Sequence, residues 1–119
     1  MQQGIALKWL KQARADLESA KCLLDSKKFD SSSFYSQQAA EKCLKAILIS
    51  KGDGLAHSHD LVFLAERAGA EQKLLGEIAV LSPLYVRTRY PDFEESIPAE
   101  AITQAKANAA FATASKVIE

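Results

Sequence analysis

The chain has 119 residues, which suffices for one domain of ordinary size and leaves no room for a second core. Fifteen lysines and arginines balance fifteen aspartates and glutamates, so the formal net charge is zero. This balance excludes a strongly basic protein whose charge alone would hold nucleic acid, and it also excludes an acidic tail protein. The composition, 48% hydrophobic and 25% charged with five glycines and three prolines, indicates a globular and mainly helical protein.

The N-terminal half of the chain predicts two long helices. Apolar residues recur every three or four positions over residues 5–26, and a second apolar stripe follows over residues 32–51. The run Asp-Ser-Ser-Ser at 30–33 offers side-chain oxygens that could cap the second helix. Gly52 and Gly54 are expected to end it, because glycine tolerates the left-handed backbone of a helix end.

Two shorter helices are expected in the middle of the chain. Ser58 or Asp60 could cap the first of them, over residues 59–68. The second spans residues 71–87, and Pro83 should kink it because proline lacks a backbone donor.

A last helix is predicted over residues 98–118. Pro98 suits its first turn, and its many alanines let it lie close against neighbours. No stretch alternates with the period of two that a strand requires. The sequence therefore predicts an all-α fold, an up-and-down bundle of four to five helices, in a single domain over residues 1–119.

Neither a signal peptide nor a membrane span is expected, because every apolar run is far shorter than the roughly 20 residues that a spanning helix needs. The chain is therefore predicted to be cytoplasmic, with no membrane partner. Cys22 and Cys43 have no CxxC partner, and we interpret them as two buried thiols. A disulfide between two helices is the alternative.

The first constellation that could carry chemistry lies in the second predicted helix. Gln37, Glu41 and Lys45 are four residues apart and share one face, with Gln38 and Lys42 beside them. One interpretation is a solvated face with a Glu–Lys pair worth about 0.3–0.5 kcal/mol. The other is a polar stripe that lines a cleft, where Lys42 or Lys45 contacts a phosphate.

The second constellation is His57-Ser58-His59-Asp60. Two histidines and an aspartate could bind a metal, but no third ligand stands at a diagnostic spacing. We therefore expect a capped helix start here and no metal site.

The third constellation follows the predicted kinked helix. Arg87 and Arg89 carry planar guanidinium groups that fit phosphate oxygens, and Tyr90 can stack on a base. The alternative is that these arginines pair with the acidic residues at 92–95 and close the loop. Motifs of nucleotide-binding loops and of serine or zinc hydrolases are absent, so a hydrolase with an activated nucleophile or a dinucleotide enzyme is not expected.

Taken together, several blocks of the sequence resemble the HEPN domain family, and they occur in the family's order over residues 5–118. The blocks are Trp9 with A-D-L-E-S-A at 15–20, F-Y-S-Q-Q-A-A-E-K-C-L-K-A at 34–46, H-D-L at 59–61, and Tyr85 with R-Y-P-D at 89–92.

The resemblance implies an all-α bundle that pairs as a homodimer, with a polar cleft near the dimer axis. Small prokaryotic members are often partners of a minimal nucleotidyltransferase in toxin–antitoxin-like pairs. Many members are metal-independent ribonucleases in which an arginine is followed, after four to six residues, by a histidine. This chain departs from that signature, because its only histidines, His57 and His59, lie upstream of Arg87 and Arg89.

The leading hypothesis is a nucleotide- or RNA-phosphate-binding module, a dimer acting beside a nucleotidyltransferase and needing no cofactor. Arg87 and Arg89 would contact phosphate, Lys42 or Lys45 would lie opposite, and Tyr90 would stack on the base or close the cleft.

Glu41 belongs to the same predicted ligand-binding face as Lys42 and Lys45.

A second hypothesis is a metal-independent ribonuclease toxin with an altered site, in which His59 and Arg89 would be the catalytic pair. A third is a purely structural dimerisation bundle. Whether the protein is an enzyme stays open at this point.

Overall fold

The computed structural model describes residues 2–52, 58–84 and 97–118. These residues form six helices and no strand, so the predicted all-α class is confirmed. The helices are α1 (Gln2–Asp25), α2 (Phe29–Ser50), α3 (Leu61–Ala68), α4 (Gln72–Leu81), α6 (Pro98–Ala101) and α7 (Gln104–Ile118).

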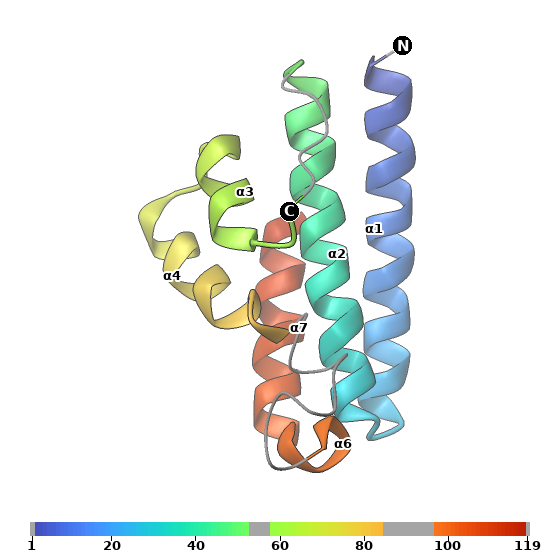
Figure 1. Ribbon diagram of the computed structural model, residues 1–119. Coiled ribbons are helices and arrows are strands. Elements are labelled where there is room, and N and C mark those ends of the chain that lie inside the picture. The colour runs from blue at the N-terminus through green and yellow to red at the C-terminus, as the bar shows by residue number, and fades with distance from the viewer. Residues whose placement is uncertain (1, 53–57, 85–96, 119) are drawn as a thin grey trace.

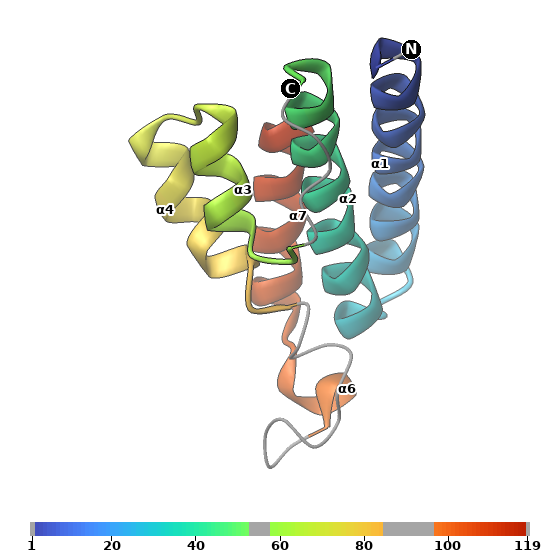
Figure 2. The ribbon, with the colours of Figure 1, turned by 45° about the horizontal axis from the view of Figure 1, so that its top comes forward.

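The helices form a bundle built around α2. Helices α1 and α2 make a long antiparallel hairpin, and α7 packs against α2 (Figures 1 and 2). Helix α3 also contacts α2, while α4 lies on α3 and α7 at the outer side. The single turn α6 lies at the end of the bundle, next to the start of α7. The predicted helical bundle is therefore confirmed.

Side chains from several helices meet in one apolar core. Leu44 and Leu48 of α2 pack with Leu61 and Leu64 of α3 and with Leu81 of α4. On the other side of α2, fully buried alanines of both helices bring α1 close: Ala13, Ala20 and Ala39. Because α2 is enclosed from both sides, polar side chains on it are also drawn into the interior.

The turn between α1 and α2 depends on a lysine in a left-handed conformation. Lys27 has φ of 62°, and the next backbone N–H donates to the carbonyl of Leu23 at 2.8 Å. Helix α2 begins with Lys28 as its N-cap, and no side chain caps it. The predicted cap at 30–33 is therefore wrong. Those residues lie inside α2, and Ser32 instead donates a buried hydrogen bond to the carbonyl of Ala20 at 2.7 Å.

Helix α3 begins as the sequence predicts. The Asp60 carboxylate accepts from the backbone N–H groups of Val62 at 3.1 Å and Phe63 at 3.3 Å. The Leu61 N–H donates to the Ser82 hydroxyl at 3.0 Å, which ties the start of α3 to the end of α4. Gly69, with φ of 84°, ends α3.

The predicted kinked helix over 71–87 is interrupted at Ser82 and Pro83. Helix α4 ends at Leu81, and Ser82 and Pro83 form a turn. A proline at this position would clash with the carbonyl four residues earlier, so it ends the helix instead of bending it. Residues 85–87 of the prediction lie outside the described part of the chain.

The predicted continuous helix over 98–118 is also wrong, because it is interrupted between α6 and α7. Ile102 is extended, with φ of −88° and ψ of 113°, and its side chain is buried in the core. Thr103 then caps α7, since its hydroxyl accepts from the N–H of Lys106 at 3.2 Å. The insertion of Ile102 into the core and the new cap together explain the break.

The two cysteines differ. Cys43 is buried as predicted, and desolvation raises the pKa of its thiol, an effect that the charge of Arg14 opposes. Cys22 is exposed, so its predicted burial is wrong. Both thiols are free. Across residues 2–52, 58–84 and 97–118, no helix combines the length and the apolar character that crossing a membrane requires.

We expect Thr103→Ala to lower the free energy of unfolding by about 1 kcal/mol, because the first turn of α7 loses its side-chain cap. Urea denaturation followed by circular dichroism measures this loss. Ser19→Ala is the matched control, since Ser19 is exposed within α1 and caps nothing. Equal stability of the two variants would contradict the capping role.

Candidate functional site

The polar stripe of α2 is buried. Gln37, Glu41 and Lys45 lie on one face, as their spacing predicts, but all three are almost fully enclosed by neighbouring helices. Lys45 Nζ lies 3.1 Å from a Glu41 carboxylate oxygen, and Gln37 Nε2 lies 3.3 Å from the other. The interpretation as a solvated face is therefore wrong.

His59 approaches the same carboxylate from the segment ahead of α3. Its Nδ1 lies 2.9 Å from Glu41 Oε1, while half of its side chain, 50%, stays exposed. Glu41, at 4% exposure, thus sits between a lysine and an imidazole. His59 therefore contacts α2 through Glu41, in addition to its place at the start of α3. His57 lies outside the described residues.

This arrangement orients the His59 ring relative to Glu41. A buried carboxylate is costly unless it is paired, and here Lys45 and Gln37 satisfy it together with the imidazole. A neutral His59 that donates its Nδ1 proton to Glu41 has its lone pair on Nε2, which is the arrangement of an oriented general base. In the described part of the chain, no group of three His, Cys, Asp or Glu side chains could hold a metal ion.

A second ion pair joins α1 to α2. Lys42 Nζ lies 2.6 Å from Asp16, whose side chain is only 6% exposed, and Gln12 Nε2 donates to the other carboxylate oxygen at 3.0 Å. Asp16 is not among the site residues that the sequence predicts. The available signal was its place on the buried face of α1, between Ala13 and Ala20.

Trp9 of α1 completes this surface. Lys45 Nζ lies 5.8 Å from the centre of its ring, within range of a cation–π interaction. A hollow of about 290 Å³ is lined by Lys8, Trp9, Gln12 and Lys42, and we call it the Trp9 hollow. Its wall is mainly apolar, formed by the indole and by the side chains of two lysines and a glutamine. The apolar periodicity over residues 5–26 includes Trp9, but its place beside the α2 lysines follows from the packing of the hairpin.

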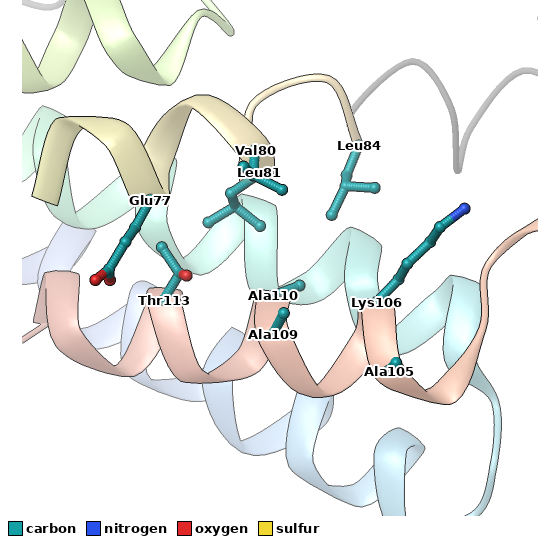
Figure 3. Close-up of a pocket in the computed structure, with 9 residues that line it drawn as sticks. All are labelled: Glu77, Val80, Leu81, Leu84, Ala105, Lys106, Ala109, Ala110 and Thr113. Atoms are coloured by element: carbon teal, nitrogen blue, oxygen red, sulfur yellow. The ribbon is translucent and has the colours of Figure 1, made fainter.

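A larger cavity, of about 450 Å³, lies elsewhere, between α4 and α7 (Figure 3). Its wall is mainly apolar, with Leu81 and Leu84 facing the alanines of α7. Glu77 and Lys106 stand at its two ends, and Glu77 is paired with Lys116 at 3.0 Å. Such a lining offers little to an anion, so this cavity does not match the predicted phosphate site.

The remaining predicted ligand residues, Arg87, Arg89 and Tyr90, lie outside the described residues. Their assignment stays a prediction. Of the predicted set, the structure brings Glu41, Lys45 and His59 into one cluster and places Lys42 beside it on the α1 side.

The bundle built on a long α1–α2 hairpin, with a carboxylate–imidazole pair at its centre, defines a small helical domain of known type. The family model of the HEPN domain matches residues 6–119, and the chain belongs to this family.

Solved structures agree with this assignment. TT1696 from Thermus thermophilus is 31% identical, with a TM-score of 0.87 over 95% of this chain and 92% of that one. ST0689, described as an archaeal HEPN homologue, is 29% identical, with a TM-score of 0.82 over 95% and 91%. No curated protein matches the chain.

We expect Glu41→Gln to lower the free energy of unfolding by about 3 kcal/mol, because Lys45 would stay buried without its counter-charge. Urea denaturation at neutral pH measures the loss. Glu18→Gln, an exposed change of the same chemistry in α1, should leave stability within about 0.5 kcal/mol of the parent. A small effect of Glu41→Gln would show that the cluster does not hold the fold together.

Proposed function

We propose that this HEPN-family chain binds the phosphate of a nucleotide or of RNA, as a dimeric accessory partner of a nucleotidyltransferase in a toxin–antitoxin-like pair. In this proposal it is a single cytoplasmic domain. The observation that carries the binding proposal is the Trp9 hollow, where Lys8 and Lys42 stand beside an indole. An aromatic face stacks on a base, and ammonium groups pair with phosphate oxygens.

The two lysines of α2 take different parts in this proposal. Lys42 is 23% exposed and makes one short contact to Asp16, and an ammonium group has three donors. Its other donors can therefore serve a phosphate without breaking the ion pair. Lys45, at 8% exposure, is held between Glu41 and Trp9, so its role is to position those two side chains.

The proposed nucleotidyltransferase partner rests on family membership, and the proposed role of the arginines rests on the sequence. Arg87 and Arg89 would add guanidinium groups to the phosphate site, and Tyr90 would stack on the base or close the cleft. Small HEPN proteins often pair with minimal nucleotidyltransferases and often form dimers, and we extend both properties to this chain.

One observation favours a second candidate, a metal-independent ribonuclease. His59 is oriented by Glu41 at 2.9 Å and is half exposed, so its imidazole could accept the proton of a ribose 2′-hydroxyl. Arg89 would then stabilise the charge that develops on the phosphate. This arrangement would replace the histidine that the family signature places after the arginine.

Titration with ATP at low salt tests the binding proposal. Trp9 is the only tryptophan, so stacking of a base in the Trp9 hollow should change its fluorescence. We expect Lys8→Ala and Arg89→Ala each to weaken binding about tenfold, because each removes one charged partner of the phosphate. Lys28→Ala, an exposed lysine at the start of α2, is the control. Unchanged affinity of Lys8→Ala would remove the hollow from the site.

Incubation with RNA in the presence of a chelator tests the second candidate. Cleavage should occur without metal and should be lost on His59→Ala, while His57→Ala, which replaces the other histidine, should retain it. RNA that stays intact after prolonged incubation with the parent protein would reject a ribonuclease.

A further inference from the structure

The first half of α1 is a local excess of positive charge in a chain of zero net charge. Lys8, Lys11 and Arg14 are its only charged residues before Asp16. All three are exposed. Among the residues that the structure describes, none of the three takes part in an ion pair, whereas Asp16 is already neutralised by Lys42.

Apolar side chains are exposed on the same half of α1. Leu7 is 65% exposed and Ile5 is 48% exposed, but the two are two residues apart and so lie on different faces of the helix. Leu7 and Leu10 line two hollows, of about 300 Å³ and about 360 Å³. Leu7 and Leu10 border both hollows, so the two lie next to each other, and we treat them as one groove.

The groove follows the seam between α1 and α2. Its floor includes Leu10 of α1 and Ala46 and Ile47 of α2, and the cationic bank is formed by Lys11 and Arg14. We call it the Leu7 groove. Helix α7 reaches α2 near Cys43, whose thiol lies 3.6 Å from the Val117 carbonyl. Beyond that level α1 and α2 continue without α7 beside them (Figures 1 and 2).

We propose that the Leu7 groove docks an acidic amphipathic helix of another protein. Leu7, Lys11 and Arg14 are spaced by four and then three residues, so they form one stripe along α1, about 10 Å long at a rise of 1.5 Å per residue. Two turns of a partner helix span that length. Its carboxylates would face Lys11 and Arg14 while its apolar side chains fill the groove.

The groove has both an apolar floor and cationic side chains, and this combination favours an acidic helix over other anionic ligands. RNA would pair its phosphates with the cations but would leave Leu7 against a polar backbone. A lipid surface would accept exposed aliphatic side chains but is flat, whereas the walls from α1 and α2 form a concavity. The combination of a concave apolar floor and a cationic bank fits a charged amphipathic helix best.

This inference is independent of the phosphate proposal. Trp9, Gln12 and Lys42 line the Trp9 hollow on the other side of α1, and only Lys8 borders both surfaces. Substitution of Lys11 and Arg14 should therefore leave ATP binding unchanged at physiological salt, where exposed charges more than about 8 Å apart are largely screened. Failure of one proposal can thus be distinguished from failure of the other.

A library of helical peptides displayed on phage provides the test. The full chain is the bait, and a Lys11→Glu/Arg14→Glu variant is used for counter-selection. Enriched peptides should carry Asp or Glu three or four residues apart, with aliphatic or aromatic residues on the adjoining face. An enriched peptide, labelled with fluorescein, should bind at least about tenfold more weakly to the double variant and to Leu7→Ser, as fluorescence anisotropy measures.

The matched control is Lys28→Glu/Lys73→Glu, which makes the same change in net charge at exposed lysines away from the groove. It should bind the peptide like the parent. Absence of enriched peptides, or equal binding by both double variants, would overturn the proposal. So would binding of poly(U) RNA, of phosphatidylcholine–phosphatidylserine vesicles, or of a second copy of the chain that is lost in the Lys11→Glu/Arg14→Glu variant while no peptide binds.

Discussion

The interaction on which this structure depends is the buried Glu41 carboxylate of α2. A carboxylate in the interior is stable only when its charge is matched and its oxygens are hydrogen-bonded, and here Lys45 and Gln37 of the same helix supply part of that requirement. His59 supplies the rest from outside the helix. The carboxylate therefore joins α2 to the start of α3, and it sets the orientation of an imidazole whose side chain is half exposed. Trp9, lying over Lys45, brings α1 into the same arrangement.

A second constraint concerns the register of α1 on α2. Much of the seam between these helices is built from alanines such as Ala13, Ala20 and Ala39, and small side chains of equal size pack similarly after a shift along the helix. The Lys42–Asp16 pair cannot tolerate such a shift, because sliding by one turn would leave a buried carboxylate without its counter-charge. The polar contact thus selects one of several apolar packings, and it places Trp9 beside the lysines of α2.

The sequence predicts the helices well because hydrophobic periodicity is local, and the shared face of Gln37, Glu41 and Lys45 follows from helical spacing alone. It does not predict their burial, since a stripe of charges at this spacing is typical of solvent-exposed helices until a second element covers it. The helix break at Ile102 also depends on tertiary packing, because the Ile102 side chain is buried in the core. Thr103 is a residue type that commonly caps helices, but the alanine-rich sequence around it favoured one continuous helix. Asp16 and Trp9 join the site only because α1 packs against α2, and the sequence pattern of a single helix does not show such packing.

The uneven distribution of charged residues explains how a chain of zero net charge could offer the two proposed binding surfaces. The balance of fifteen cations and fifteen anions describes the whole molecule, but a ligand meets only a face of it, and the described acids that pair with α2 lysines are already engaged inside. The cations of the first half of α1 make no ion pair with any described residue, and they project from both edges of the helix. One edge adjoins an indole and the other an aliphatic groove, so the two proposed ligands would meet different neighbours of these cations. Because these surfaces lie on opposite sides of α1, a phosphate and a protein helix could be held at the same time.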